Sequence, residues 1–199
     1  MISEKNLPKK IVLFASGSGT NAANIIKYFQ HSNKAEIVLV LTNKKNAGVI
    51  GRVQNLGVDT FVFTRKELYE SGEVLERLRI IQPDLIVLAG FLWMFPPIIL
   101  QEFQDKVVNI HPALLPKYGG KGMYGMNVHQ AVVDQKETES GISIHFVNEV
   151  YDEGKLIFQK SVPITPEDTP EAVAEKIHAL EYEHFPKVIE QLLFPDSDE

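Results

Sequence analysis

Short apolar runs alternate with helix-length segments along most of the chain. Four runs are apolar at nearly every position and rich in β-branched residues: 11–15, 37–41, 85–89 and 107–110. A fifth candidate covers residues 58–63. Runs without polar positions are typical of strands buried on both faces, as in a parallel sheet covered by helices.

The segments between these runs have the length and spacing of helices. They cover residues 21–29, 47–56, 65–81 and 96–103, and the third carries Leu68, Leu75, Leu78 and Ile81 broadly on one helical face. Regular alternation of strand and helix predicts an α/β fold with a doubly wound, mostly parallel, Rossmann-like sheet.

The pattern changes after Gly125. A helix over 126–134 is followed by two strand-like runs within 141–164, joined at "NEVYDEG", and by a C-terminal helix that starts near Pro170 and ends near Leu193. Apolar Ile142 and Ile144 alternate with Ser143 and His145, which predicts a strand with one core face. We expect one domain over 1–199, with halves of about 1–105 and 106–194 and a frayed acidic tail.

Composition narrows the class of protein. The apolar fraction of 44% and charged fraction of 23% are ordinary for a globular protein, and the net charge of -6 argues against nucleic-acid binding. The absence of cysteine excludes disulfides and thiolate metal sites, and the six histidines show no H-E-x-x-H spacing, so we expect no metal. The N-terminus has too few apolar residues for a signal peptide or a membrane span. We expect a cytoplasmic monomer or homodimer without a membrane or nucleic-acid partner.

The segment "ASGSGTNA", residues 15–22, follows the first strand and opens the first helix. Backbone N–H groups and the helix dipole make such a junction an anion site, and Gly17 and Gly19 permit a tight turn and close approach of a phosphate. Thr20 and Asn21 can cap the helix and donate hydrogen bonds. A simple strand-to-helix turn is the alternative.

The same glycines also fit a dinucleotide fingerprint. Gly17, Gly19 and Ala22 match G-x-G-x-x-G/A, and Lys44 with Lys45 could hold a 2′-phosphate. That reading requires an acidic residue after the second strand, where this chain has "LTNKK". A phosphate monoester is therefore favoured over a dinucleotide.

Bulky apolar side chains follow the strand at 85–89. Phe91, Leu92, Trp93, Met94 and Phe95 stand in succession where open α/β sheets bind ligands. Burial in the core and an aromatic slot for a flat ligand explain this density equally well.

The segment "VVNIHPALLPKYGGKGMYG", residues 107–125, places Asn109 and His111 at a strand end before Pro112. The two side chains share a parity and can offer two N–H donors to one oxygen, a donor set that stabilises an oxyanion. A satisfied structural pair is the alternative. Asp152, in "YDEG", could accept a proton or orient His111, although Asp-Glu-Gly is also ordinary turn chemistry.

Together, "SGSGTN", "LAGF", "NIHPALLPKY" and "YDEG" resemble the folate-dependent formyltransferase family over essentially the whole chain, and "SGSGTN" points to the members that act on glycinamide ribonucleotide. The resemblance implies Asn109, His111 and Asp152 as catalytic residues. It implies substrate binding by Gly19, Thr20, Asn21, Pro112, His178 and Glu181. It implies a folate pocket formed by Phe91, Leu92, Trp93, Met94, Phe95, Val147, Asn148 and Tyr151.

The implied reaction transfers the formyl group of 10-formyltetrahydrofolate to the amine of 5-phosphoribosylglycinamide. Two features depart from the family pattern: Leu92-Trp93 replaces a typical Met-Arg pair, and the glycine-rich loop over 119–125 is longer, which makes His129 a candidate for a supporting role. A formyltetrahydrofolate hydrolase and an NAD(P)- or nucleotide-binding protein are the rival predictions.

Overall fold

The sheet confirms the predicted α/β class. In the computed structural model, which describes residues 7–195, seven strands follow the order β3-β2-β1-β4-β5-β6-β7. β1 pairs in parallel with β2 and β4, and β2 with β3, whereas β6 pairs antiparallel with β5 and β7. The strands are β1 (Lys9–Phe14), β2 (Ala35–Thr42), β3 (Thr60–Val62), β4 (Leu85–Leu88), β5 (Val107–His111), β6 (Glu139–Phe146) and β7 (Leu156–Pro163).

The helices occupy the segments between the apolar runs. They are α1 (Thr20–Ser32), α2 (Gly48–Gln54), α3 (Arg65–Tyr69), α4 (Glu73–Ile81), α5 (Pro97–Glu102), α6 (Met126–Asp134) and α7 (Pro170–Leu193). The predicted acidic tail lies, from residue 196 on, outside the described residues.

The chain forms two compact units. Unit 1 comprises the chain up to Phe91 together with the chain from Glu190, and unit 2 comprises Leu92–Ile189. The single-domain organisation expected from the sequence stays a prediction.

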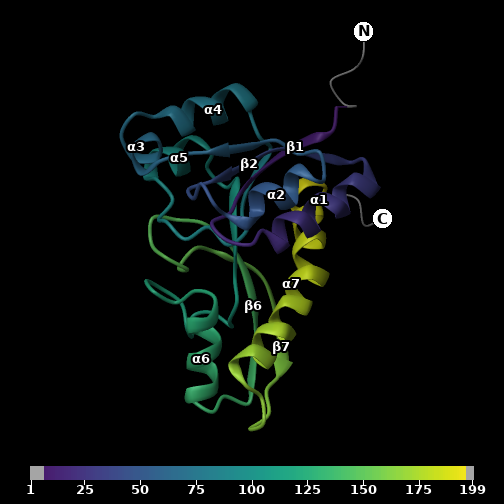
Figure 1. Ribbon diagram of the computed structural model, residues 1–199, viewed down its shortest axis with the longest axis vertical. Helices are drawn as coiled ribbons and strands as arrows, with labels where there is room; N and C mark the ends of the chain where they lie inside the picture. The colour runs from purple at the N-terminus through teal and green to yellow at the C-terminus, as the bar shows by residue number, and fades with distance from the viewer. Residues whose placement is uncertain (1–6, 196–199) are drawn as a thin grey trace. The chain divides into compact units, whose positions relative to one another are not determined.

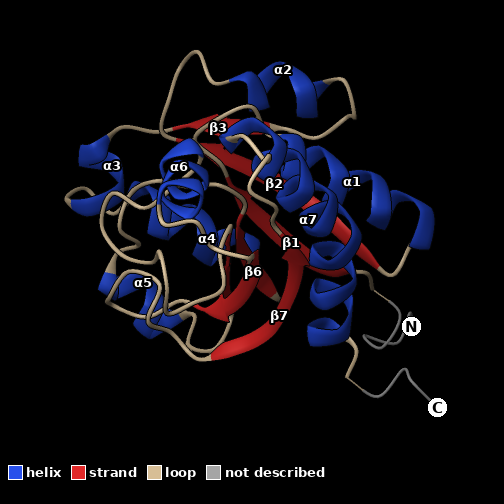
Figure 2. Ribbon diagram, turned by 90° about the horizontal axis from the view of Figure 1, so that it is seen from below, coloured by secondary structure: helices blue, strands red, loops and turns tan. Residues whose placement is uncertain are grey.

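In unit 1, helices cover both faces of the parallel strands. Figure 1 shows α1 and α2 on one face of β1 and β2 and α4 on the other, and Figure 2 shows the strands behind α1 when seen from below. β1 is buried from Ile11 to Phe14, as expected for a central strand. The rings of Phe14, Phe63 and Phe91 form an aromatic core, with centroids 5.4–6.0 Å apart.

The segment predicted as one helix over 65–81 contains two. The capping box of Thr64 and Glu67 starts α3, and Gly72, with φ at 75°, precedes α4. A left-handed residue interrupts helical backbone, and glycine adopts this conformation without a steric penalty. The apolar spacing continues across the break, so periodicity alone predicted one helix.

In unit 2, the long β6–β7 hairpin has α6 and α7 running along it (Figure 1). The prediction that β6 has a single core face is wrong, because Ser143 and His145 are as buried as Ile142 and Ile144. Hydrogen bonds replace water around the serine: its Oγ donates to the Ala113 carbonyl at 2.6 Å and accepts from the Leu115 N–H at 2.9 Å.

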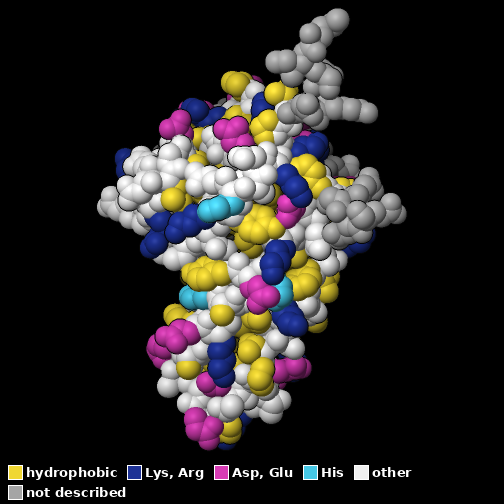
Figure 3. Space-filling view, turned by 90° about the vertical axis from the view of Figure 1, so that its right-hand side faces the viewer, with side chains coloured by type: hydrophobic (Ala, Val, Ile, Leu, Met, Phe, Trp, Pro, Cys, Tyr) yellow, Lys and Arg dark blue, Asp and Glu magenta, His cyan; other side chains and the backbone are white. Residues whose placement is uncertain are grey.

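The surface is mixed in charge. Figure 3 shows basic and acidic side chains interspersed on the face that it draws. Within residues 7–195, no helix is long and apolar enough to cross a membrane.

Candidate functional site

The glycine loop between β1 and α1 is held from behind by α2. Gly19 has φ at 76°, and a Cβ at this position would lie 2.5 Å from the Val49 Cβ. The Val49 N–H donates to the Gly17 carbonyl at 3.1 Å. Gly19 gives α1 no side-chain cap, and the first N–H groups of a helix lack intrahelical partners. The junction, which includes Thr20 and Asn21, therefore has the geometry of an anion site.

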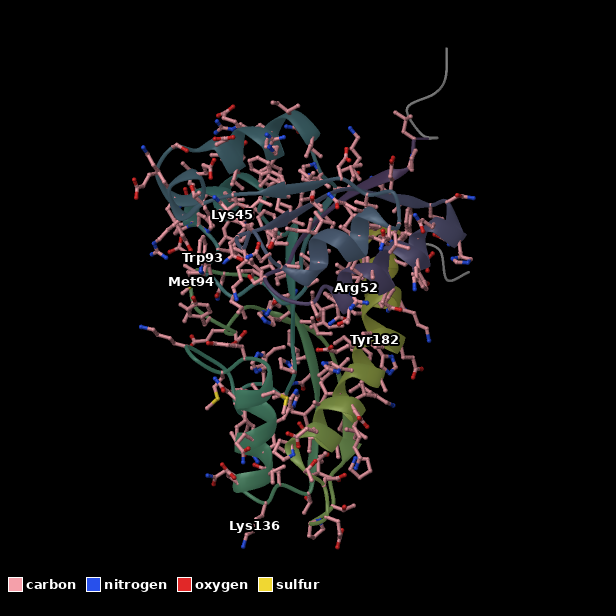
Figure 4. The ribbon with its side chains drawn as sticks, viewed as in Figure 1. Lys45, Arg52, Trp93, Met94, Lys136 and Tyr182 are labelled. Carbon is pink, nitrogen blue, oxygen red and sulfur yellow. The ribbon has the colours of Figure 1, made fainter. Side chains whose placement is uncertain are left out.

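Arg52 of α2 lies beside this loop, which the sequence pattern did not indicate. Its Nε donates to the Ser18 carbonyl at 3.0 Å. Figure 4 shows the side chain extending from α2 toward the start of α1. The two residues are 34 positions apart, so only the packing of α2 on the loop brings them together. A guanidinium is well suited to bind a phosphate.

In unit 2, one polar cluster contains the three predicted catalytic residues. The β5–β6 register places Asn109 opposite His145, and the Asn109 Nδ2 lies 3.1 Å from the His145 Nε2. Asp152 contacts both histidines: its Oδ2 lies 3.4 Å from the His111 Nδ1 and its Oδ1 3.6 Å from the His145 Nε2. His145 thus belongs to this cluster, although the alternating sequence pattern had placed it on the face of β6 away from the core.

Backbone carbonyls orient both imidazoles. The Nε2 of His111 lies 2.7 Å from the Tyr118 carbonyl oxygen, and the Nδ1 of His145 lies 2.9 Å from that of Phe146. Because a carbonyl only accepts, each of these nitrogens carries a proton. The Nδ1 of His111 therefore faces Asp152, and the Nε2 of His145 accepts from the Asn109 amide.

Burial and charge oppose each other in this cluster. Burial lowers the pKa of His111, whereas the Asp152 carboxylate and the Tyr118 carbonyl raise it. The effect of burial is larger, so the pKa lies below the ordinary value of histidine. Burial raises the pKa of Asp152, but the interactions of its carboxylate with His145, His111 and the Gly120 N–H lower it more. Asp152 is therefore a carboxylate at neutral pH beside a mostly neutral imidazole.

The turn after β6 fixes the position of Asp152. Asp152 itself has φ at 58°, in the left-handed region. A Cβ on Gly154 would lie 1.6 Å from the Phe146 carbonyl oxygen, so only glycine fits there. The Gly120 N–H donates to the Asp152 Oδ2 at 2.9 Å. These contacts explain the "YDEG" motif in physical terms.

The apolar segment after β4 divides into packed and accessible parts. Phe91 and Phe95 are 8% and 2% exposed, which assigns their rings to core packing. Leu92, Trp93 and Met94 are half-buried. Figure 4 shows Trp93 and Met94 next to each other.

The remaining predicted folate residues lie in the turn between β6 and β7. Val147 and Tyr151 are half-buried, and Asn148 is exposed. The Asn148 Oδ1 accepts from the Val150 N–H at 3.0 Å, which shapes the turn.

The predicted substrate residues of unit 2 differ in burial. Glu181 is only 6% exposed, although it lies on the polar-rich helix α7. One turn earlier, the exposed His178 stacks on Tyr182, the α7 residue labelled in Figure 4, with ring centroids 6.1 Å apart. Pro112, directly after β5, is half-buried.

His129 is a buried histidine on α6. It is 2% exposed, and its Nδ1 has no hydrogen-bond partner among residues 7–195. Burial, followed by the charges of His178 and His111, lowers the pKa of His129 to about 4. In the same part of the chain, no group of three or more His, Cys, Asp or Glu side chains is arranged to hold a metal ion.

Comparison with known proteins defines the class. The formyl transferase family model matches residues 9–189. The chain therefore belongs to the formyl transferase family, in agreement with the resemblance carried by its motifs.

Several relatives within this class carry the name phosphoribosylglycinamide formyltransferase. The chain is similar to the phosphoribosylglycinamide formyltransferase of Haemophilus influenzae, with 37% identity over 91% of this chain and 85% of that protein. The chloroplastic enzyme of the same name from Arabidopsis thaliana is 36% identical over 91% of this chain. The chain spans 64% of that plant protein and 61% of its Vigna unguiculata counterpart. The crystal structure of phosphoribosylglycinamide formyltransferase from Bacillus halodurans matches with a TM-score of 0.83 at 33% identity, over 96% of this chain and 97% of that one.

Proposed function

We propose that this protein transfers the formyl group of 10-formyltetrahydrofolate to the primary amine of 5-phosphoribosylglycinamide, in de novo purine synthesis. One observation carries the proposal: a formyl transferase chain brings Asn109, His111, His145 and Asp152 into one hydrogen-bonded cluster. The names of the relatives support the choice of acceptor. A dinucleotide-binding role is not favoured, because the glycine fingerprint is its sole support.

Asn109 and His111 act on the developing oxyanion. The amine lone pair adds to the formyl carbon, and the carbonyl oxygen takes up the negative charge. The Asn109 amide donates to that oxygen, and His111 stabilises it once the imidazole is protonated. Fixed donors of this kind need no reorganisation during the reaction, so they lower the barrier.

Asp152 and His111 transfer the proton that the attacking amine loses. The His111 Nδ1 is the ring nitrogen without a proton, so it is the one that can accept the proton lost by the amine, directly or through water. The imidazolium then pairs with the Asp152 carboxylate. Collapse of the tetrahedral intermediate breaks the bond between the formyl carbon and N10, and N10 of the tetrahydrofolate takes up the proton. No covalent enzyme intermediate is required.

The remaining residues hold the two substrates. Gly19, Thr20 and Asn21 are proposed to bind the phosphate, and Glu181 the ribose, with Pro112 and His178 as further contacts. The folate is proposed to lie against Leu92, Trp93, Met94, Val147, Asn148 and Tyr151, with Phe91 and Phe95 supporting this surface from the core. We propose that the enzyme acts in the cytoplasm as a monomer or homodimer. Its substrates are small molecules, and it needs no resident metal.

The test compares two formyl acceptors and adds a separate measurement of ligand binding. Formation of tetrahydrofolate from 10-formyltetrahydrofolate is measured with glycinamide ribonucleotide and with water alone, and the binding of NADPH and of a folate analogue is titrated separately. Turnover that depends on the ribonucleotide supports the proposal. Equal turnover in water alone indicates a hydrolase, and tight NADPH binding without folate binding indicates the dinucleotide role.

A further inference from the structure

The segment 117–120, which leads into the glycine-rich loop, contacts both ionisable catalytic residues. The Tyr118 carbonyl accepts from the His111 Nε2 at 2.7 Å, and the Gly120 N–H donates to the Asp152 Oδ2 at 2.9 Å. One short stretch of backbone thus fixes which nitrogen of His111 is protonated and where its carboxylate partner lies.

This stretch has an unusual backbone conformation that its surroundings must maintain. Tyr118 has φ at 57° and Gly120 has φ at 92°. For a non-glycine residue the left-handed conformation costs roughly 1 kcal/mol or more, so it persists where other contacts favour it. Rotation of Tyr118 back to negative φ would move its carbonyl away from His111.

Glu137 supplies those contacts. Its Oε1 accepts from the Tyr118 phenol at 2.9 Å, and its two carboxylate oxygens lie 2.9 and 3.2 Å from the Lys117 Nζ. The Glu137 N–H in turn donates to the Val132 carbonyl at 3.1 Å, which anchors it at the end of α6. Burial and the Glu137 carboxylate raise the pKa of Tyr118 to about 12, so its phenol remains a donor.

We propose that Glu137, acting through the Tyr118 phenol, is a positioning residue that holds segment 117–120 against the catalytic pair His111 and Asp152. The inference rests on the proposed function, because it assigns the pair its role in formyl transfer. The side-chain hydrogen bonds of Glu137 go to Lys117 and Tyr118. Its effect on His111 and Asp152 therefore passes through the Tyr118 backbone.

The chain offers matched variants. Tyr118→Phe removes the phenol oxygen and leaves the carbonyl, Glu137→Ala removes the whole anchor, and Glu137→Gln keeps an oxygen that can accept from the phenol. Lys136→Gln is the control: Lys136 directly precedes Glu137, is exposed, and extends away from the rest of unit 2 in Figure 4.

Two readouts separate positioning from simple folding. Tyr118→Phe and Glu137→Ala are expected to lower kcat about tenfold with KM changed less than about twofold, because a misplacement of about 1 Å can cost up to ~10²-fold in rate. Their pH–rate profiles should also move, since Asp152 loses the Gly120 N–H and His111 the Tyr118 carbonyl, while His145 and His129 still face the pair. Glu137→Gln should keep most of the rate, and Lys136→Gln all of it.

Nitrogen-15 NMR of the histidine rings tests the proposal without turnover. His111 should be the Nε2–H form in the wild type and a mixture of forms in Tyr118→Phe and Glu137→Ala. Unchanged His111 signals with wild-type kcat in both variants would overturn the proposal, as would a loss confined to Glu137→Ala when Tyr118→Phe behaves as wild type. If the wild type transfers no formyl group, the proposed function fails, while the His111 signals still decide whether Glu137 positions the ring.

Discussion

Gly19→Ala is expected to damage phosphate binding, whereas Gly17→Ala is not. A Cβ on Gly19 would lie 2.5 Å from both the Cβ and Cγ2 of Val49 and 2.6 Å from its Cα, about 1 Å inside ordinary contact. Relief requires the loop to move from α2, because Val49 sits on helical backbone. The φ of 76° adds roughly 1–2 kcal/mol for any residue with a side chain. Gly17 has nothing within 4 Å of such a Cβ and no positive φ.

The consequence is a loss of affinity rather than of chemistry. If the displaced loop loses one charge-assisted hydrogen bond of about 1.5–3 kcal/mol, KM for the ribonucleotide rises roughly tenfold to a hundredfold. kcat should stay within about threefold, since the substitution leaves the side chains of Asn109, His111 and Asp152 unchanged. Steady-state kinetics with varied ribonucleotide and saturating folate measure both. Wild-type KM in a folded Gly19→Ala enzyme, or an equal rise in Gly17→Ala, would refute the reasoning.

Three further substitutions are informative. Asn109→Ala should lower kcat by about 10²–10³ while the protein still folds, as for other lost oxyanion donors, and near wild-type turnover would remove Asn109 from the mechanism. Arg52→Ala should raise KM for the ribonucleotide about fivefold, with a smaller effect at high salt, and an unchanged KM at low salt would argue against a phosphate contact. His129→Gln should reduce acid sensitivity: the pKa of about 4 lies below the unfolded value, so stabilisation is full above pH 6.5 and is lost as the pH falls toward 4. Between pH 6.5 and pH 4, denaturant titrations should show that the free energy of unfolding falls by roughly 3 kcal/mol less in the variant than in the wild type. The same fall in both proteins would contradict this prediction.

Local chemistry explains why much of the fold was predictable. Apolar runs make up most of β1, β2 and β5 and all of β4, because helices or neighbouring strands cover these segments, so the hydrophobic pattern alone locates them. The helix over 126–134 was predicted with the bounds that the structure shows. The break at Gly72 was missed because it changes backbone conformation without changing the apolar spacing on either side.

Contacts between segments far apart in the sequence could not be predicted from the hydrophobic pattern. His145 was assigned to the other face of β6, since a period of two cannot show that a strand between β5 and β7 is buried on both faces. Arg52 and Glu137 are ordinary charged residues in their own segments, and only tertiary packing brings them to Ser18 and Tyr118. Asn109, His111 and Asp152 could be proposed from the sequence because they stand at a strand end and in a turn that also carry family motifs, and their catalytic role stays a prediction.

Isotope tracing tests formyl transfer most directly. The purified protein is incubated with 10-formyltetrahydrofolate labelled with carbon-13 in the formyl group and with 5-phosphoribosylglycinamide, and the products are identified by mass spectrometry. Formyl transfer predicts that the label appears in formylglycinamide ribonucleotide, with one tetrahydrofolate released for each product. Asn109→Ala should form this product about 10²–10³ times more slowly. Label recovered as formate at a rate independent of the ribonucleotide, or not released at all, would contradict the proposed function.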